Sequence, residues 1–330
     1  MQPLYFHVIE QICAEKNYQF KNLDTFSGIL GEIRHGDKSI LIGDSQYPLN
    51  SHTAVMTSTD KALMYLALEN AAVKIPHGNY FFISPHARDK RADGKELMDA
   101  IHYANDRGYP QFVKPINSYS GDFATVINSE AELLPHLQKT SEKYHAVIIQ
   151  EPIFQQEHRL FIMDGKAWFS YDKKRAELIG DGESTIEQLL ETFLDQRKQQ
   201  YKDNSYRLNQ RFINETLTKK NLSYDSVLAA DKVLSISPNA NPNCGGFINN
   251  FTTTIPPECT EWGVKIAKII GLRICAIDFF THDTINDNPE DFLVIEVNGN
   301  PSLKMVWSLG YQLLVKAIWQ YIVKTCLKEA

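Results

Sequence analysis

The sequence predicts an α+β fold. Short apolar segments with the alternation of β-strands are mixed with segments that have helical periodicity. Several strands are joined by tight turns, and Gly36-Asp37 and Asp164-Gly165 are typical of antiparallel hairpins. Hairpins mixed with helices favour an α+β architecture over a regular doubly wound parallel sheet. The chain has 330 residues, which is enough for about two domains at ~150 residues each.

The N-terminal part predicts a small unit followed by a capped helix. Thr59 or Asp60 provides a side chain suited to the N-cap of that helix. In chain order we expect a helix at 3–19, strands at 27–35 and 38–42, a polar linker at 43–53, and a helix ending near 72.

In the middle of the chain, strands and helices alternate. Residues 146–150 are almost continuously apolar, which indicates a strand buried on both faces. Ser129 and Glu132 have the spacing of a capping box and predict a helix start. The other elements expected here are strands at 80–84, 111–115 and 122–127 and a helix at 94–107.

The last part combines a hairpin, a polar segment and three strands. Ser184 and Glu187 form a second capping-box pattern, for a helix that runs to about residue 200. Residues 201–226 are polar and predict an exposed helical excursion. The remaining expected elements are hairpin strands at 157–163 and 166–171, strands at 232–237, 273–281 and 292–298, and a helix at 307–324.

Composition excludes several classes of protein. A hydrophobic content of 43% and a charged content of 22% are ordinary for a globular enzyme. The net charge of -6 argues against a nucleic-acid partner. No apolar run approaches the ~20 residues of a membrane span, and the N-terminus lacks the pattern of a signal peptide. The five cysteines contain no C-x-x-C pair, so we expect a cytoplasmic location.

Oxygen-bearing side chains gather on two C-terminal strands. Glu296 and Asn298 are two residues apart and therefore project from one strand face, whereas Val297 points the other way. Asp278 lies in an apolar strand, where an unpaired carboxylate would be costly. Carboxylates and amide oxygens are ligands that Mg²⁺ prefers. The pattern predicts a metal site. The alternative for Glu296 alone is an ordinary surface carboxylate at the end of a strand.

The segment around Lys114 indicates binding of an anion. Lys114 ends a buried strand before a small polar loop at 117–122, which can cradle phosphates with charge and backbone N–H groups. The alternative for a lysine at a strand end is simple solvation. Neither G-x-x-x-x-G-K-[ST] nor G-x-G-x-x-G occurs, which disfavours P-loop and Rossmann nucleotide sites.

The hairpin at 157–171 carries paired charges. Glu157 and Arg159 share one strand face, and Lys173 and Arg175 are expected to share a face of the second strand. The acid could bind ribose, and the cations could offset phosphate charge. The alternative is a cross-strand ladder of ion pairs on a solvated sheet face.

Taken in order, these segments resemble the ATP-grasp superfamily of carboxylate–amine ligases. The resemblance covers roughly residues 58–305. The segments at 179–186 and 241–246 are similar to cyanophycin synthetases and to the ATP-grasp part of bifunctional glutathione synthetases, and the segment at 296–303 resembles ribosomal-protein glutamate ligases. The motif series consists of Asp60-Lys61, 112–115, 150–159, Asp278 and 296–298.

The resemblance implies an ATP-grasp fold in which two α+β lobes clamp ATP. It implies a short N-terminal region at 1–57, a small lobe at 58–150 and a large lobe at 151–330 that includes the polar insertion at 201–226. It also implies a set of site residues. The residues that would bind the nucleotide are Lys61, Lys114, Ser120, Gly121, Gln150, Glu151, Ile153 and Glu157. The metal ligands would be Asp278, Glu296 and Asn298, and the catalytic residues Arg159, Lys173, Arg175 and Asn241.

The implied activity is ATP-dependent formation of an amide bond through an acyl phosphate, with release of ADP and phosphate. The cofactors would be ATP and one or two Mg²⁺ ions, for which Mn²⁺ can substitute. An amino acid or small peptide would supply the carboxylate, and an amine would accept it. A protein or ribosomally made peptide as substrate, an inactive ATP-binding module and a homodimer stay open as alternatives. Cys244 is interpreted as a small residue that packs a turn, with a reactive thiol as the alternative because it adjoins Gly245-Gly246.

Overall fold

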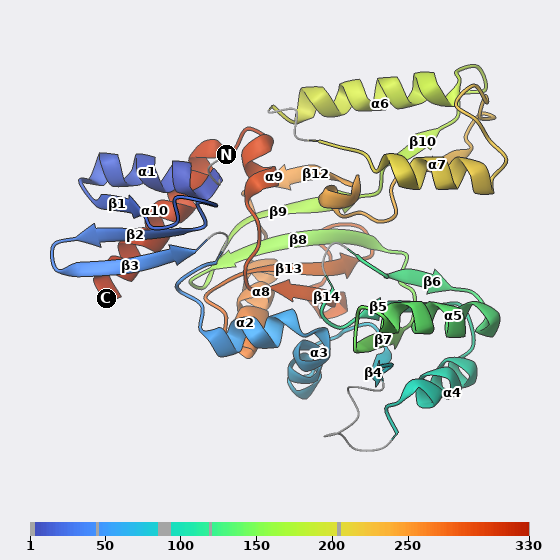
Figure 1. Ribbon diagram of the computed structural model, residues 1–330, viewed down its shortest axis with the longest axis horizontal. Helices are drawn as coiled ribbons and strands as arrows, with labels where there is room; N and C mark the ends of the chain where they lie inside the picture. Colours follow the sequence, from blue (N-terminus) through green and yellow to red (C-terminus); the bar gives the residue numbers. More distant parts are fainter. Residues whose placement is uncertain (1–3, 44–45, 85–93, 119–120, 203–205, 330) are drawn as a thin grey trace.

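The computed structural model describes residues 4–43, 46–84, 94–118, 121–202 and 206–329. It confirms the α+β class (Figure 1). The sheets have the strand orders β1-β2-β3, β4-β7-β5-β6, β12-β9-β8-β13-β14 and β10-β11, and all of their strand pairs are antiparallel. No described helix is long and apolar enough to cross a membrane.

The strands are β1 (Gln19–Asn22), β2 (Leu30–His35), β3 (Lys38–Gly43), β4 (Gly78–Phe82), β5 (Gln111–Pro115), β6 (Thr125–Ile127), β7 (Ala146–Gln150), β8 (Gln156–Met163), β9 (Lys166–Lys174), β10 (Glu177–Ile179), β11 (Val233–Ser235), β12 (Phe247–Thr252), β13 (Ile274–Thr281) and β14 (Leu293–Asn298). The α-helices are α1 (Leu4–Lys16), α2 (His52–Thr59), α3 (Lys61–Asn70), α4 (Leu97–Arg107), α5 (Glu130–Ser141), α6 (Ile186–Gln200), α7 (Gln210–Lys219), α8 (Pro257–Ile270), α9 (Lys304–Ser308) and α10 (Gln312–Glu329). Two short 3₁₀ turns are η2 (Pro242–Cys244) and η3 (Pro289–Asp291).

The four-stranded sheet separates an apolar face from a polar one. Val147 and Ile149 of β7 pack with Val113 of β5 against α4 and α5. Because side chains alternate along a strand, Lys114 and Gln150 lie on the opposite face. All five residues of β7 are buried, as their apolar run predicts.

The five-stranded sheet is the centre of the molecule. Helix α8 covers one of its faces, and it approaches closely at Gly263, where an added Cβ would overlap Leu160 and Ile162 of β8. In the register of the sheet, Asp278 of β13 lies opposite both Arg159 of β8 and Glu296 of β14. The charged side chains predicted from three separate segments are therefore neighbours.

Helix α3 begins where the sequence indicates. The Asp60 side chain accepts hydrogen bonds from the backbone N–H groups of Ala62 and Leu63, which confirms it as the N-cap. Met64 and Leu68 of this helix are fully buried in the core that also includes α8 and β14. The helix thus joins the core of the five-stranded sheet directly after α2.

The N-terminal unit is integrated with the C-terminal end of the chain. Helix α1 and the sheet β1-β2-β3 pack with α10 around the buried side chains of Phe6, Ile33 and Trp319. Figure 1 shows this unit at one end of the molecule and the four-stranded sheet with α4 and α5 at the other.

The prediction of a polar linker at 43–53 is wrong for its described part. Tyr47 and Leu49 are buried, and α2 begins at His52. The Asn50 side chain forms four hydrogen bonds with backbone groups, which fix the start of β13 and the turn after β14. Its Nδ2 donates to the carbonyls of Ile274 (2.8 Å) and Gly299 (2.7 Å), and its Oδ1 accepts from the N–H groups of Arg273 and Ile274, both at 2.9 Å.

The helix in the polar segment predicted at 201–226 is α7, and it is not a solvated excursion. Ile213 and Leu217 of α7 are buried against Leu178 and Leu190 in a separate apolar cluster. Figure 1 shows α6 and α7 together beside β10. The amphipathic spacing of α7 was obscured in the sequence by the many Asn, Lys and Gln residues around its few apolar positions.

Several local predictions need correction. The cap of α6 is Thr185, with Gln188 as its capping-box partner, one residue later than the predicted Ser184 pattern. Ser129 is the N-cap of α5 but makes no side-chain cap bond, and Glu132 accepts instead from the N–H of Asn128. The predicted strand at 122–127 is shortened to β6. The elements that sequence analysis missed are β1, α2, β10, β12 and α8, and the helix predicted at 307–324 is divided into α9 and α10.

Replacing Asn50 with alanine should lower the free energy of unfolding by about 2–4 kcal/mol, because four backbone groups lose their hydrogen-bond partner. Urea denaturation measures this difference. The matched control is Asn70→Ala on α3, since Asn70 is exposed and bonds only within its own helix, to the Leu66 carbonyl. The control should change stability by less than about 0.5 kcal/mol. Equal effects of the two substitutions would contradict the role given to Asn50.

Candidate active site

A buried ion-pair network lies on one face of the five-stranded sheet. The Asp278 carboxylate is 1% exposed and accepts two hydrogen bonds from Arg159, from Nε at 2.6 Å and from Nη2 at 2.7 Å. Lys173 of β9 also lies 3.3 Å from Asp278 and forms an ion pair with Glu157. Burial raises the pKa of Asp278, but the charges of Arg159 and Lys173 outweigh it and hold that pKa below its usual value.

The Glu157–Lys173 pair is the cross-strand contact that the register of β8 and β9 dictates. The Lys173 side chain is only 7% exposed, so the alternative of an ion-pair ladder on a solvated face does not describe it. Burial lowers the pKa of Lys173, but the neighbouring carboxylates of Asp278 and Glu157 raise it above its ordinary value. Lys173 is therefore charged at neutral pH.

Lys61 connects α3 with two other segments. Its Nζ lies 3.1 Å from Oε1 of Glu296 on β14 and donates to the carbonyl oxygen of Ser118 at 3.0 Å. The lysine side chain is 8% exposed. The first residue of the helix thus links the strand of the predicted metal ligands to the segment that follows β5.

Lys114 is held differently. Its Nζ donates to the hydroxyl of Tyr65 at 2.9 Å and lies 5.2 Å from the centre of that ring. Within the described part of the chain, no carboxylate lies in ion-pair contact with it. Burial lowers the pKa of Lys114 to about 8, although the more distant charges of Glu296 and Glu157 raise it.

The residues predicted to bind a metal lie on one sheet face. Asn298 is opposite Ala276, so it shares the face of Glu296 and Asp278. Its amide nitrogen is buried and has no partner among the described residues. No three His, Cys, Asp or Glu side chains of those residues come close enough together to hold a metal ion. The carboxylates of Asp278 and Glu296 and the side-chain amide oxygen of Asn298 nevertheless match the oxygen-rich donor set of Mg²⁺.

The charges of this face nearly cancel. The cations Lys61, Lys114, Arg159 and Lys173 face the carboxylates of Glu157, Asp278 and Glu296, which leaves one positive charge. If a ligand carried both phosphates and a divalent cation, its phosphates could pair with these cations and its metal ion with these carboxylates. No buried charge would then be left unpaired.

The segment after β7 contributes the predicted adenine site. Gln150 is buried, and its Oε1 lies 3.5 Å from the Tyr65 hydroxyl. The Glu151 backbone N–H donates to the His77 carbonyl, and the Glu151 carboxylate accepts from the His77 N–H. The next backbone N–H group along this segment belongs to Ile153, because Pro152 has none.

The predicted phosphate loop contacts the turn that contains Asn241. Gly121 has a φ of +73°, and a Cβ there would overlap the side-chain amide of Asn239. Asn239 in turn accepts from the Asn241 N–H at 2.9 Å. The Asn241 side chain accepts from the Asn243 N–H and so caps η2. Ser120, also predicted to contact phosphate, lies outside the described residues.

The structure bears on two sequence-based hypotheses about nearby residues, Arg175 and Cys244. Arg175 was expected on the same strand face as Lys173, but β9 ends at Lys174 and Arg175 is exposed beyond it. Burial raises the pKa of the Cys244 thiol, which disfavours the reactive thiolate. Packing of the turn is therefore the better interpretation of Cys244.

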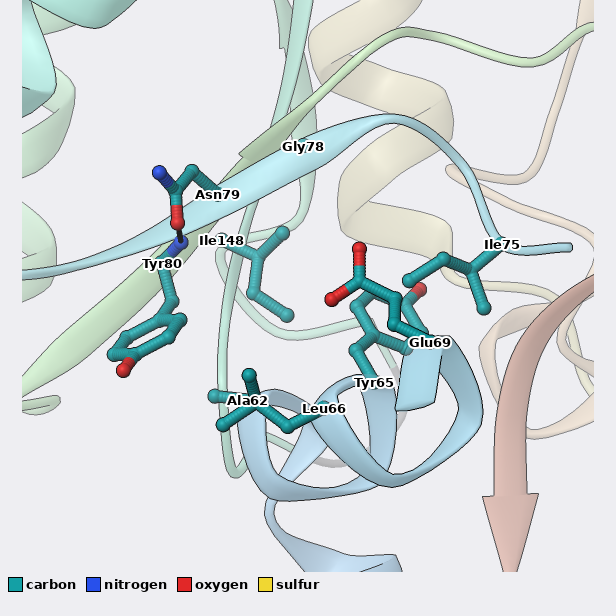
Figure 2. A pocket seen from close by; sticks show the side chains of 9 residues that line it. All are labelled: Ala62, Tyr65, Leu66, Glu69, Ile75, Gly78, Asn79, Tyr80 and Ile148. Atoms are coloured by element: carbon teal, nitrogen blue, oxygen red, sulfur yellow. Dashed lines mark hydrogen bonds between the residues drawn. The ribbon is translucent and has the colours of Figure 1, made fainter. Parts of the chain in front are cut away.

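A small cavity adjoins the site on the side of α3. It has a volume of about 50 Å³, far below the ~300 Å³ or more of typical small-molecule pockets. Figure 2 shows Tyr65 and Glu69 of α3 facing Ile148 of β7 and the segment from Ile75 to Tyr80. The cavity therefore marks a gap between α3 and the four-stranded sheet rather than a nucleotide pocket.

Sequence analysis missed two residues of this arrangement. Tyr65 follows Lys61 by four residues, so both lie on one face of α3. That spacing was a usable signal, because Lys61 had been identified. Asn239 carried no comparable signal, since its importance comes from a contact with Gly121, 118 residues earlier.

Comparison with solved structures decides the fold. The chain aligns over 100% of its length with 44% of a bifunctional glutathione synthetase from Pasteurella multocida, with a TM-score of 0.59 and 16% identity. The chain has the ATP-grasp fold. This confirms the fold class predicted from the ordered motifs.

Curated relatives agree with this assignment. The ATP-grasp chain is 32% identical over 263 residues to the cyanophycin synthetase of Crocosphaera subtropica. The alignment covers 76% of this chain and 28% of the relative. It is 24% identical over 328 residues to the bifunctional glutathione biosynthesis protein of Streptococcus mutans, covering 92% of this chain and 42% of that protein. The chain thus spans less than half the length of these relatives. No protein-family model matches it.

The lowered pKa of Lys114 predicts a pH-dependent effect on stability. Below pH 8 the lysine is charged in both states and its burial destabilises the fold, and this penalty falls as the pH rises from about 8 toward 10.5. Lys114→Met should therefore be more stable than the wild type at pH 7, on the order of 1–3 kcal/mol, with a smaller difference at pH 9.5.

Chemical denaturation at the two pH values measures this change. Lys139→Met, at an exposed position of α5, is the matched control and should show no such pH-dependent difference. A stability difference for Lys114→Met that is the same at pH 7 and pH 9.5 would contradict the assignment.

Proposed function

We propose that this ATP-grasp chain is an ATP-dependent carboxylate–amine ligase that forms an amide bond through an acyl phosphate. The observation that carries the proposal is the single sheet face that brings Lys61, Glu296, Arg159 and Asp278 together. Similarity to proteins named cyanophycin synthetase and glutathione biosynthesis protein supports it. In this proposal residues 58–150 and 151–330 supply the two lobes, and an amino acid or peptide supplies the carboxylate.

ATP would lie between the four-stranded and five-stranded sheets. Lys61 and Lys114 would offset the phosphate charges. Lys61 now donates to the Ser118 carbonyl, and Lys114 donates to the Tyr65 hydroxyl. Glu157 would hold the ribose, and the backbone near Ile153 would contact adenine. The Lys61–Glu296 and Lys173–Glu157 ion pairs would be exchanged for contacts with the nucleotide.

The metal site in this proposal consists of Asp278, Glu296 and Asn298. Bound Mg²⁺, as one or two ions, would neutralise phosphate charge during transfer. Arg159 and Lys173 would keep Asp278 ionised and fixed in its strand register.

The reaction has two balanced steps. A carboxylate oxygen of the substrate forms a bond to the γ-phosphorus, and the bond to the β–γ bridging oxygen breaks, so ADP leaves. An amine then attacks the carbonyl carbon, phosphate leaves, and the amine loses a proton. Arg159 and Lys173 would offset the negative charge that develops in the first step. The turn at Asn241 would lie on the side of the acceptor.

ADP formation with Mg-ATP and pools of amino acids and small peptides tests the proposal. Release of ADP should require a particular pair of substrates, one carboxylate and one amine. The rate should fall at least about 100-fold in Glu296→Gln, since a charge at the nucleotide site is lost. The matched control is Glu290→Ala, at an exposed position of η3. The control should retain wild-type activity.

Two results would change the proposal. Binding of ATP without turnover on small substrates, followed by a mass increase of a peptide or protein substrate, would assign the same chemistry to a macromolecular acceptor. Equal ADP release by wild type and Glu296→Gln would contradict the role of the sheet face.

A further inference from the structure

The hydrogen bond between Tyr65 and Lys114 has a defined donor and acceptor. The Tyr65 hydroxyl donates to the carbonyl oxygen of Ile295 at 2.9 Å and accepts from Nζ of Lys114 at 2.9 Å. A phenol has one proton, and the shorter contact to Ile295 takes it in preference to the 3.5 Å contact with Gln150. The oxygen lone pairs are therefore directed at Lys114.

This contact joins three parts of the fold. Tyr65 is on α3, Lys114 is on β5 of the four-stranded sheet, and Ile295 immediately precedes Glu296 on β14. Lys61, one helical turn before Tyr65, makes a parallel connection from Ser118 to Glu296. The same face of α3 thus ties the segment around β5 to the strand of the predicted metal ligands at two points.

The chemistry of the two connections differs. Lys61 is paired with a carboxylate, as Lys173 is, whereas Lys114 is oriented by an uncharged hydroxyl. A hydroxyl fixes the direction of an ammonium group but leaves its full charge available for an incoming anion. A carboxylate in the same place would have to be displaced from the lysine before a phosphate could bind.

We propose that Tyr65 is the positioning residue for Lys114: it directs the Lys114 ammonium toward the nucleotide phosphates and couples that group to the backbone of β14. The assignment rests on the proposed nucleotide site. Tyr65 acts through Lys114 and takes no part in the reaction itself.

A purely structural role for Tyr65 makes a different prediction. If the hydroxyl served only to attach α3 to β14, its removal would lower stability but leave the chemical behaviour of Lys114 unchanged. The charged groups that bear on Lys114 are Glu296 of β14 and Glu157 of β8, and neither is altered by replacing Tyr65 with phenylalanine. A change in Lys114 would therefore report the loss of the hydroxyl.

The experiment compares Tyr65→Phe with Tyr80→Phe in the full chain. Tyr80 lines the same cavity from β4 (Figure 2). Nζ of Lys95 lies 4.7 Å from the centre of the Tyr80 ring. The first measurement is acylation of Lys114 by a mild anhydride, followed by peptide mass spectrometry from pH 6.5 to 9.5 without nucleotide. The second is calorimetric binding of Mg-ATP, and of AMP, which lacks the β- and γ-phosphates.

In Tyr65→Phe, the pH midpoint of Lys114 acylation should fall, because the charged amine loses its acceptor. Mg-ATP should bind about tenfold more weakly, with a smaller change for AMP. Tyr80→Phe should match the wild type. A Tyr65→Phe variant whose Lys114 acylation profile equals that of the wild type would overturn the assignment of Tyr65.

The two measurements separate this inference from the proposed function. If the wild type binds no Mg-ATP but Tyr65→Phe still shifts the acylation of Lys114, the positioning of Lys114 stands and the nucleotide site fails. If the wild type binds Mg-ATP and Tyr65→Phe binds it equally well, Tyr65 does not position Lys114 for phosphate and the inference fails alone.

Discussion

Asp278 is an ionised carboxylate in the middle of an apolar strand, with 1% of its side chain exposed. Such a group is stable only when it is paired and fully hydrogen-bonded. Arg159 and Lys173 supply the pairing from the two strands on one side of β13, and they draw Glu157 into the same network. The register of β9, β8 and β13 and the charges of the candidate site therefore depend on one carboxylate.

The segments outside the five-stranded sheet act as supports for this face. Helix α3 links it to the four-stranded sheet through Lys61 and Tyr65. On the other side, Asn50 fixes both the start of β13 and the turn after β14. The N-terminal unit is short, but its hydrogen bonds reach the strand ends on which the candidate metal ligands are placed. Its contribution is to hold those strands in position.

Periodicity and turn chemistry predicted most of the fold. The apolar run of β7 and the hairpin between β8 and β9 are local signals, and the structure confirms both elements. Helix α8 and strand β12 were missed, because their burial depends on the surface against which they pack. Helix α7 was misjudged for a related reason, since its two buried side chains, Ile213 and Leu217, are surrounded by polar residues.

The candidate site was predictable where the chemistry is carried by residue type. Glu296, Asp278 and Lys114 were identified because charged residues in apolar strands are unusual. Their partners were harder to predict, because pairing depends on strand register. The prediction that Arg175 shares a strand face with Lys173 was wrong for a related reason. A spacing of two residues implies a shared face only while the strand continues, and β9 ends at Lys174.

The central claim is that the ion pairs of this sheet face are exchanged for contacts with Mg-ATP. A crystal structure with Mg²⁺ and a non-hydrolysable ATP analogue tests it most directly. The account predicts phosphates between Lys61 and Lys114, a metal ion within bonding distance of Asp278 and Glu296, and a lengthened contact between Lys61 and Glu296. An analogue bound elsewhere, with the 3.1 Å contact between Lys61 and Glu296 intact, would contradict the account.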